Sequence, residues 1–204
     1  MNFTRLNTAF IPPKEISEKA IELSKAISNS TETHFVLDGV NFYPHITIYA
    51  PEYPEEKMSE VLEAVEQVSK SFFPIKFKYK RIDSLQGYIG ISFDQAPEIK
   101  AIHKQIVEAL NPLREGRIRE KYSEYQMQFT DAQLKNIKEY GYPDEMNLYD
   151  PHLTITRLKD EDKTEEIIPT INWDIPEFVV SKIGVYEMGE NGTCKELIKE
   201  FNLR

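Results

Sequence analysis

The strongest constraint on the fold is a five-residue phrase that the chain contains twice, at residues 44–48 and 151–155. Each copy begins with proline, which a strand tolerates at its first position, and then alternates polar residues with aliphatic ones. Alternation with a period of two is typical of a strand that buries one side and leaves the other free. The sequence therefore predicts two half-buried strands of the same design, far apart in the chain.

The two phrases place the same side chains on the same faces. Because successive side chains of a strand point to opposite faces, His45 and Thr47 share one face while the aliphatic residues point to the other. His152 and Thr154 are placed in the same way. The chain has only 4 histidines, so we interpret the repeat as functional. The structural alternative is that these side chains only satisfy local hydrogen bonds.

Apolar periodicity predicts that helices and strands alternate along the rest of the chain. Helices are expected around the apolar stripe from Ile16 to Ile27, over 55–71, over 97–110 and after a capping box at Thr130, and strands over 6–11, 35–37, 75–81, 88–93, 178–187 and 193–201. Residues 159–168 are expected to form a charged helix or turn. The connections are too short for large crossovers, which favours helices packed on a largely antiparallel sheet.

Composition limits the class of protein. A chain of 204 residues, 40% of them hydrophobic, is long enough for one domain with a sizeable core. No apolar run approaches the ~20 residues that span a bilayer, the N-terminus lacks the pattern of a signal peptide, and the single cysteine fits a reducing compartment. We therefore expect a cytoplasmic monomer without membrane contact. The net charge of −9 argues against extended nucleic-acid binding and favours a small nucleotide or a strand end.

The paired motif resembles that of the two-histidine (2H) phosphoesterase superfamily, which includes RNA 2′,3′-cyclic phosphodiesterases and 2′-5′ RNA ligase-like proteins. Both His-x-Thr-x tetrads are intact, as HITI from His45 and HLTI from His152. The opening segment 7–27 and the closing segment 178–203 also resemble the ends of that family. Residues 1–204 would then form one bilobal domain.

The resemblance implies an α+β fold. In it, two pseudo-symmetric lobes of mainly antiparallel sheet, with helices packed outside, flank a central groove that carries the two His-x-Thr strands. Residues at about 111–150 match nothing in the family and are predicted to be an inserted segment.

The resemblance also implies an activity, the metal-independent hydrolysis of 2′,3′-cyclic phosphates at RNA ends or in small nucleotides. Imidazole suits this chemistry because its ordinary pKa of ~6.5 lets one ring accept a proton while the other donates one. His45 and His152 would be the catalytic pair, and Thr47 and Thr154 would donate hydroxyl hydrogen bonds to the phosphate oxygens. No cofactor and no metal is expected. The sequence leaves open which histidine is the base.

Other functions remain open on the sequence alone. The same site could hydrolyse a cyclic oligonucleotide signal, or run in reverse as a 2′-5′ ligase. The scaffold could also bind nucleotides or RNA without catalysis, although a binding module need not keep two proton carriers. A metal site of His45, His152 and Asp150 is a further alternative, but no established metal-binding motif accompanies these residues.

Strand parity predicts further substrate contacts. Tyr43 and Tyr49 share the parity of His45, and Thr156 shares that of His152, so all three are predicted to bind substrate. A tyrosine there could stack on a base, although an ordinary strand aromatic has the same pattern. Arg157 has the opposite parity and is not expected at the site.

The segment 111–150 holds a second set of polar and aromatic residues. Its cations alternate with glutamates, and we interpret them as a solvated helix face rather than a phosphate site: Arg114, Arg117, Arg119 and Lys121. Its tyrosines could form a lid over the groove or a packed excursion: Tyr122, Tyr125, Tyr140, Tyr142 and Tyr149. Elsewhere in the chain, His34, His103 and Cys194 are expected to be structural.

Overall fold

The computed structural model describes residues 2–124 and 128–204. Within this part of the chain no helix has the length and apolar character needed to cross a membrane. The strands are β1 (Phe3–Phe10), β2 (Ile46–Tyr49), β3 (Glu52–Pro54), β4 (Ile75–Leu85), β5 (Tyr88–Phe93), β6 (His152–Arg157), β7 (Glu177–Val180), β8 (Lys182–Met188) and β9 (Cys194–Asn202). The helices are α1 (Lys14–Ser30), α2 (Met58–Ser69), α3 (Pro97–Leu110), α4 (Glu120–Glu124), α5 (Asp131–Tyr140) and α6 (Thr164–Ile167).

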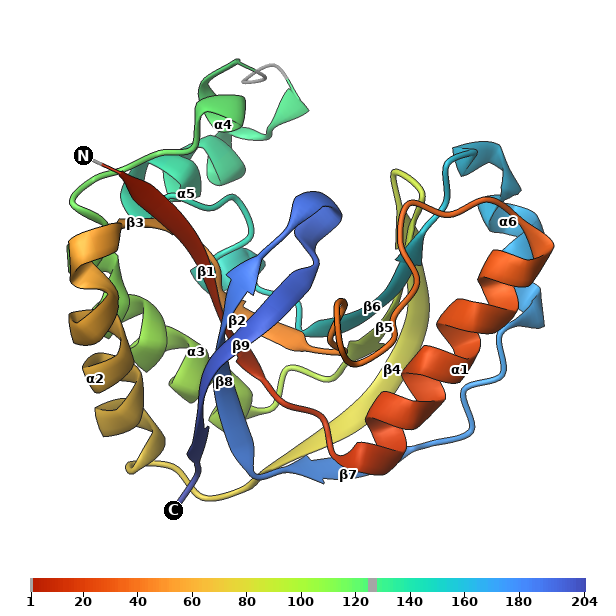
Figure 1. The fold of residues 1–204 in the computed structure, drawn as a ribbon, viewed down its shortest axis with the longest axis horizontal. Coiled ribbons are helices and arrows are strands. Elements are labelled where there is room, and N and C mark those ends of the chain that lie inside the picture. Colours follow the sequence, from red (N-terminus) through yellow and green to blue (C-terminus); the bar gives the residue numbers. More distant parts are fainter. Residues whose placement is uncertain (1, 125–127) are drawn as a thin grey trace.

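The strands form one curled antiparallel sheet in two matched halves (Figure 1). The strand order is β7-β4-β5-β6-β2-β1-β8-β9, with β3 paired to β1. The centre of this order is the contact between β6 and β2, where Ile46 pairs with Leu153. The strands from β6 outward to β7 are named the β6 half, and those from β2 outward to β9 are named the β2 half. The predicted α+β fold of antiparallel sheet with external helices is confirmed.

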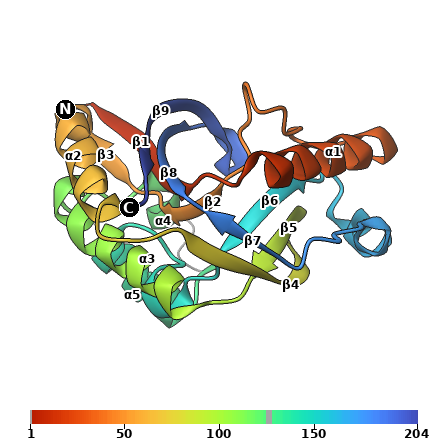
Figure 2. The same ribbon diagram turned by 90° about the horizontal axis from the view of Figure 1, so that it is seen from below.

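Helices cover one face of the sheet. Helix α1 packs on the β6 half, whereas α2 and α3 lie together over the β2 half (Figures 1 and 2). The predicted apolar stripe of α1, from Ile16 to Ile27, is buried, and it joins Ile46, Ile48, Leu153 and Ile155 in one continuous core. The aliphatic residues of both phrases therefore point to the helices, as predicted, and their polar partners point to the opposite face.

Strand β2 contains one extra residue directly after its threonine. Thr47 pairs with Ala9 of β1, but the next pair along is Tyr49 with Thr8, which leaves Ile48 unmatched. An extra residue of this kind is a β-bulge, and it reverses the facing of the residues that follow it.

Strand β6 repeats this irregularity at the corresponding position. Thr154 pairs with Gly90 of β5, and the next pair is Thr156 with Ile89, which leaves Ile155 unmatched. The two His-x-Thr strands thus match beyond their sequence motif, because each bulges one residue after its threonine. The bulges decide which neighbouring side chains reach the histidines.

Two of the predicted elements differ from the structure. Residues 35–37 form no strand, because Asp38 starts a tight turn in which its carboxylate accepts hydrogen bonds from the backbone N–H groups of Val40, Asn41 and Phe42. The strand predicted over 178–187 is divided at Ser181 into β7, which pairs with β4, and β8, which pairs with β1.

The described parts of segment 111–150, residues 111–124 and 128–150, contain short helices beside the β2 half (Figure 1). Helix α5 begins with the predicted capping box between Thr130 and Gln133. It ends at Gly141, whose φ of 75° is the left-handed conformation that glycine adopts at helix ends. Tyr125 lies outside the described residues.

A buried polar cluster ties this segment to β2. His103 of α3 donates from Nδ1 to the Ile48 carbonyl (2.9 Å), accepts at Nε2 from the Met146 backbone N–H (3.0 Å), and stacks on the ring of Tyr149. The Glu145 carboxyl lies 3.3 Å from the same Nε2 and is 1% exposed. Burial, with a smaller contribution from Asp144, raises the pKa of Glu145 well above its usual value. Burial therefore favours the neutral form of the Glu145 carboxyl.

Replacing this acid by its neutral amide changes how stability depends on pH. The folded protein holds the Glu145 proton to a higher pH than the unfolded chain, so the wild type loses stability as pH rises above the ordinary carboxyl pKa, by at most about 1.4 kcal/mol per pH unit. Glu145→Gln removes this loss. We expect the melting temperature of Glu145→Gln relative to wild type to increase from pH 5 to pH 8. A constant difference would mean that Glu145 is ionised in the folded state.

Candidate active site

The pairing of β2 with β6 brings the two His-x-Thr motifs together. Ile46 is opposite Leu153, and extending this antiparallel register by one residue each way places His45 opposite Thr154 and Thr47 opposite His152. Directly opposite residues have Cβ atoms roughly 5 Å apart, and the diagonal pair of histidines is somewhat farther apart. The four side chains share the side of the sheet away from the helices, which we call the histidine face.

Both imidazoles are held by the same local hydrogen bond. His45 Nδ1 lies 2.8 Å from the carbonyl oxygen of Tyr43, and His152 Nδ1 lies 2.8 Å from that of Asp150. Because a carbonyl only accepts, each Nδ1 carries a proton and donates it to the residue two positions earlier. Each Nε2 is thereby left to exchange a proton with a ligand.

The two histidines differ in their surroundings. His45 is 7% exposed and packs near the ring of Tyr186, whereas His152 is exposed. Burial lowers the pKa of His45 to about 4, with the positive charges of His152 and Arg5 adding to the effect and the bond to Tyr43 opposing it. His45 is therefore a neutral proton acceptor at neutral pH.

Thr47 is oriented by residues outside its own motif. Asn7 of β1 donates from Nδ2 to Thr47 Oγ1 (2.9 Å), so the threonine hydroxyl keeps its own proton for an acceptor. The Tyr149 hydroxyl donates to the Thr47 carbonyl (2.9 Å). Asn7 is not recognisable as a site residue from the sequence, because its contact with Thr47 arises from the pairing of β1 with β2 over a long sequence separation.

The β6 half supplies a polar wall beside His152. Ser92 of β5 is paired with His152 and donates to the carboxylate of Asp83, which also accepts from Arg81. Gly90 is paired with Thr154, and a Cβ there would lie 3.8 Å from the His152 ring and 3.3 Å from the Leu153 carbonyl oxygen. Glycine thus leaves space in front of the motif.

The family model described as the 2′-5′ RNA ligase superfamily matches residues 41–192 of this chain. The match covers well over half of the chain and includes both His-x-Thr motifs. The chain belongs to the 2′-5′ RNA ligase superfamily. The predicted resemblance is therefore confirmed at the level of the superfamily. No curated protein sequence matches the chain.

Solved structures of this superfamily's fold agree with the model over nearly the whole chain. TT0787 of Thermus thermophilus aligns with a TM-score of 0.59 and 15% identity over 98% of each chain. Apo LigT of E. coli aligns with a TM-score of 0.58 and 12% identity over 100% of this chain and 99% of LigT. LigT complexed with 3′-AMP aligns with a TM-score of 0.52 and 11% identity over the same shares. At these identities the likeness concerns the fold.

Two of the predicted substrate contacts are wrong, and the bulges explain why. Tyr49 follows the bulge in β2, is fully buried in the core, and donates its hydroxyl to the Tyr140 carbonyl (2.6 Å). Thr156 follows the bulge in β6, is fully buried, and donates to the Phe35 carbonyl (2.8 Å). Both side chains are turned to the helices. Tyr43 is half-buried against Tyr186 at a ring distance of 5.6 Å, near His45.

Arg157 is placed on the histidine face by the same bulge that removes Thr156. It pairs with Tyr88, and its guanidinium lies over that ring at 4.7 Å. Its Nη1 donates to Asn191 Oδ1 (2.9 Å) in the connection between β8 and β9. Arg157 thus links the two halves of the sheet, contrary to the parity argument.

The metal alternative gains no support from the positions of the side chains. The Asp150 carboxylate lies 3.5 Å from both Lys80 and Arg81, and its backbone carbonyl rather than its carboxylate meets His152. Across residues 2–124 and 128–204, no group of three His, Cys, Asp or Glu side chains could hold a metal ion.

The other residues interpreted as structural are located away from the motifs or are buried. His34 is exposed, and His103 is part of the buried cluster already described. Cys194 is fully buried, accepts a hydrogen bond from Asn7, and has a pKa raised by burial.

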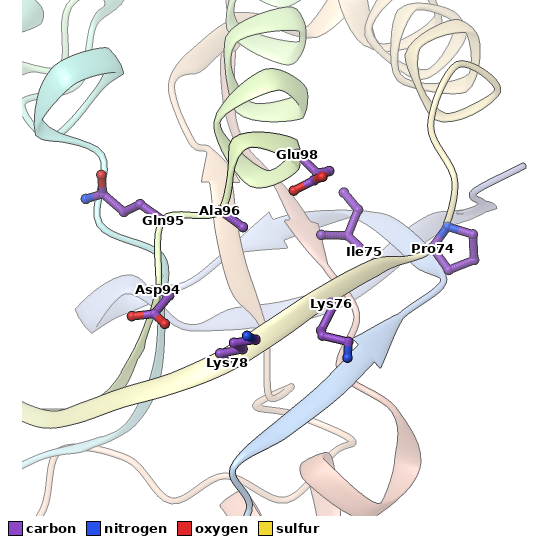
Figure 3. A pocket seen from close by; sticks show the side chains of 8 residues that line it. All are labelled: Pro74, Ile75, Lys76, Lys78, Asp94, Gln95, Ala96 and Glu98. Atoms are coloured by element: carbon purple, nitrogen blue, oxygen red, sulfur yellow. The ribbon is translucent and has the colours of Figure 1, made fainter.

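No residue of either motif lines the hollow of about 650 Å³ that Figure 3 shows. Its lining comes from the start of β4 and the link between β5 and α3, and includes Lys76, Lys78, Asp94 and Glu98. Lys76 is already paired with Glu177 at 2.8 Å. No histidine lines this hollow, so it offers no proton carrier of the kind that the motifs provide.

The Asn7 contact predicts a measurable effect on anion binding. Asn7→Ala leaves the Thr47 hydroxyl free to rotate, so we expect inorganic phosphate to bind about 3- to 10-fold more weakly, the value of one hydrogen bond. Calorimetric titration would measure this loss. Asn202→Ala, at an exposed position of β9, is the matched control and should bind phosphate like the wild type. Equal affinities for wild type and Asn7→Ala would show that Asn7 does not orient the site.

Proposed function

We propose that this protein is a metal-independent phosphodiesterase that hydrolyses 2′,3′-cyclic phosphates at RNA ends or in small nucleotides. Membership in the 2′-5′ RNA ligase superfamily supports phosphoester chemistry in general. The observation that carries the specific proposal is the matched hydrogen bonding of His45 and His152, which leaves both Nε2 atoms available on one face. Two oriented proton carriers beside two hydroxyl donors fit a phosphodiester better than any other common substrate group.

The low pKa of His45 supports a division of roles in which His45 is the base and His152 is the acid. A neutral His45 accepts a proton from the attacking water as the water oxygen forms a bond to phosphorus. Protonated His152 donates a proton to the ribose oxygen as its bond to phosphorus breaks. Thr47 and Thr154 donate hydrogen bonds to the non-bridging oxygens, where negative charge must be held during the reaction. The products are a phosphate monoester and a free ribose hydroxyl, and exchange with water returns both rings to their starting states.

Two further functions use the same residues. Hydrolysis of a cyclic oligonucleotide signal needs the same proton transfers and differs only in the size of the ligand. LigT of E. coli has been crystallised with ATP and with NADP+, so binding of whole nucleotides also fits this fold. A non-catalytic nucleotide-binding protein would be distinguished by tight binding that survives loss of both histidines without any turnover.

The catalytic assignment is tested by hydrolysis of 2′,3′-cyclic AMP and of an oligoribonucleotide that ends in a 2′,3′-cyclic phosphate, with a chelator present. We expect turnover that resists the chelator and falls about 100-fold or more in His45→Ala and in His152→Ala, because each proton transfer contributes on that scale. His34→Ala, at an exposed histidine outside the motifs, is the matched control. Activity that disappears with chelator and returns with a divalent metal would contradict the proposal.

The assignment of His45 as base also predicts the acid side of the pH profile. The base must be neutral, and His45 becomes protonated only below its pKa of about 4. Since kcat/KM reports on the free enzyme, we expect no loss of kcat/KM from protonation of a base between pH 6.5 and pH 5. A decline centred near pH 6.5, the ordinary pKa of histidine, would indicate that the base is not the buried imidazole.

A further inference from the structure

One cation, Arg5, lies next to the two motifs on the histidine face. Arg5 is two residues before Asn7 on β1, a separation of roughly 7 Å along the strand, and points to the same side of the sheet. Asn7 contacts Thr47, and the charge of Arg5 is one of the causes that lower the pKa of His45. Arg5 therefore lies close to the catalytic pair without belonging to either motif.

Segment 111–150 adds two cations to Arg5. The Arg119 guanidinium lies 5.6 Å from the centre of the Tyr122 ring, and the Lys121 ammonium lies 4.9 Å from it. Besides desolvation, the charge of Arg119 lowers the pKa of Arg5, and the charges of Arg119 and Arg5 lower the pKa of Lys121. Glu52 is paired with Arg5 across the β1–β3 ladder. The interpretation of these cations as a solvated helix face is therefore wrong for Arg119, whose side chain is 17% exposed, and for Arg114, which is 3% exposed.

The carboxylates nearby do not neutralise this group. Glu52 is shared, since it lies 2.9 Å from Arg117 Nε and 3.4 Å from Arg119 Nε. Among the described residues, the buried Arg5 Nε and Arg119 Nη1 have no hydrogen-bond partner. Unpaired buried donors on charged side chains are costly, and in a native protein they call for a further partner, such as a bound water or anion.

The neighbouring Arg114 differs from Arg5 and Arg119, because each of its guanidinium nitrogens has a hydrogen-bond partner. Arg114 is 3% exposed and donates to Asn111 and to the carbonyls of Arg117, Lys138 and Glu139. The unpartnered donors of Arg5 and Arg119 are thus not a general feature of this segment. Among the cations that the structure describes, those with a buried unpartnered donor are Arg5, two residues before Asn7 on β1, and Arg119, which shares Glu52 with Arg117.

We propose that Arg5, Arg119 and Lys121 form a second phosphate subsite, which binds a non-scissile phosphate of the substrate about one nucleotide away from the cleaved one. This inference rests on the proposed function for the position of the cleaved phosphate. It names the substrate class as nucleotides with at least two separated phosphates, such as the cyclic-phosphate end of an oligoribonucleotide, in preference to a cyclic mononucleotide. In a protein of net charge −9, such a local basic site attracts a short, highly charged ligand.

The subsite is tested by comparing two ligands that need no turnover. Calorimetric titration would measure the affinities for 3′-AMP and for adenosine 3′,5′-bisphosphate, which differ only by the second phosphate. We expect the wild type to bind the bisphosphate at least about tenfold more tightly, because charge-assisted hydrogen bonds to a phosphate are worth that much. The ratio should approach one in Arg119→Gln and in Lys121→Gln.

Lys121→Gln and the control Lys104→Gln separate loss of the subsite from loss of folding. Arg119 contacts Glu52, so Arg119→Gln could lose stability, but Lys121 is exposed and its replacement should fold normally. Lys104→Gln removes the same charge from an exposed position of α3 and should keep the wild-type ratio. A wild-type ratio near one, or an unchanged ratio in folded Lys121→Gln, would overturn the subsite.

The pH dependence of the ratio gives a second readout. Partial desolvation of the Lys121 ammonium over the ring of Tyr122 and the charges of Arg119, Arg5 and Arg157, with Glu190 opposing, lower the pKa of Lys121 to about 8. Lys121 loses its charge above this pH, so the affinity ratio should fall between pH 7 and pH 9 in the wild type but not in Lys121→Gln. A ratio that stays constant in the wild type would contradict the role of Lys121.

The affinity ratio tests the subsite, and the hydrolysis assay tests the catalysis, so each proposal can be refuted without the other. A high ratio without hydrolysis of any cyclic phosphate would keep the subsite and remove the proposed catalysis. Hydrolysis of 2′,3′-cyclic AMP together with a ratio near one would keep the catalysis and remove the subsite.

Discussion

The site depends on a single pair of residues where the two halves of the sheet meet. Because Ile46 pairs with Leu153, each histidine faces the threonine of the other motif rather than its own. A shift of one strand by one residue in this register would turn its histidine and threonine toward the helices and expose its two aliphatic residues, so the core and the site specify the same register. Burial of the aliphatic residues of each motif therefore fixes the positions of its histidine and threonine.

The two halves of the sheet differ in the surroundings of their histidines, and this difference allows the two rings to take different roles in proton transfer. Both imidazoles make the same bond to a backbone carbonyl, yet His45 is buried near Arg5 while His152 is exposed. Two chemically equal groups in unequal surroundings can take opposite roles in proton transfer. The β2 half, which carries Arg5 and the segment with Arg119, supplies both the buried base and the cations of the proposed subsite.

Sequence patterns predicted the motifs, the helix over 97–110 and the capped helix after Thr130, because these depend on local periodicity and capping. They failed where one residue changed the parity of a strand: a bulge after each threonine turned Tyr49 and Thr156 into the core and brought Arg157 to the histidine face. They also missed Asn7, because its contact with Thr47 arises from strand pairing over a long separation. Strand parity is reliable only up to the first bulge, and bulges leave no clear mark in composition.

The central claim is that both imidazoles present Nε2 to one shared phosphate site. It is tested most directly by nitrogen-15 NMR of the histidine side chains during titration with inorganic phosphate, with signals assigned from His45→Ala and His152→Ala. The account predicts a proton on Nδ1 of both rings throughout, and chemical-shift changes in both that follow one common Kd. A proton on Nε2 of either neutral ring, or a response to phosphate from only one of the two, would contradict it.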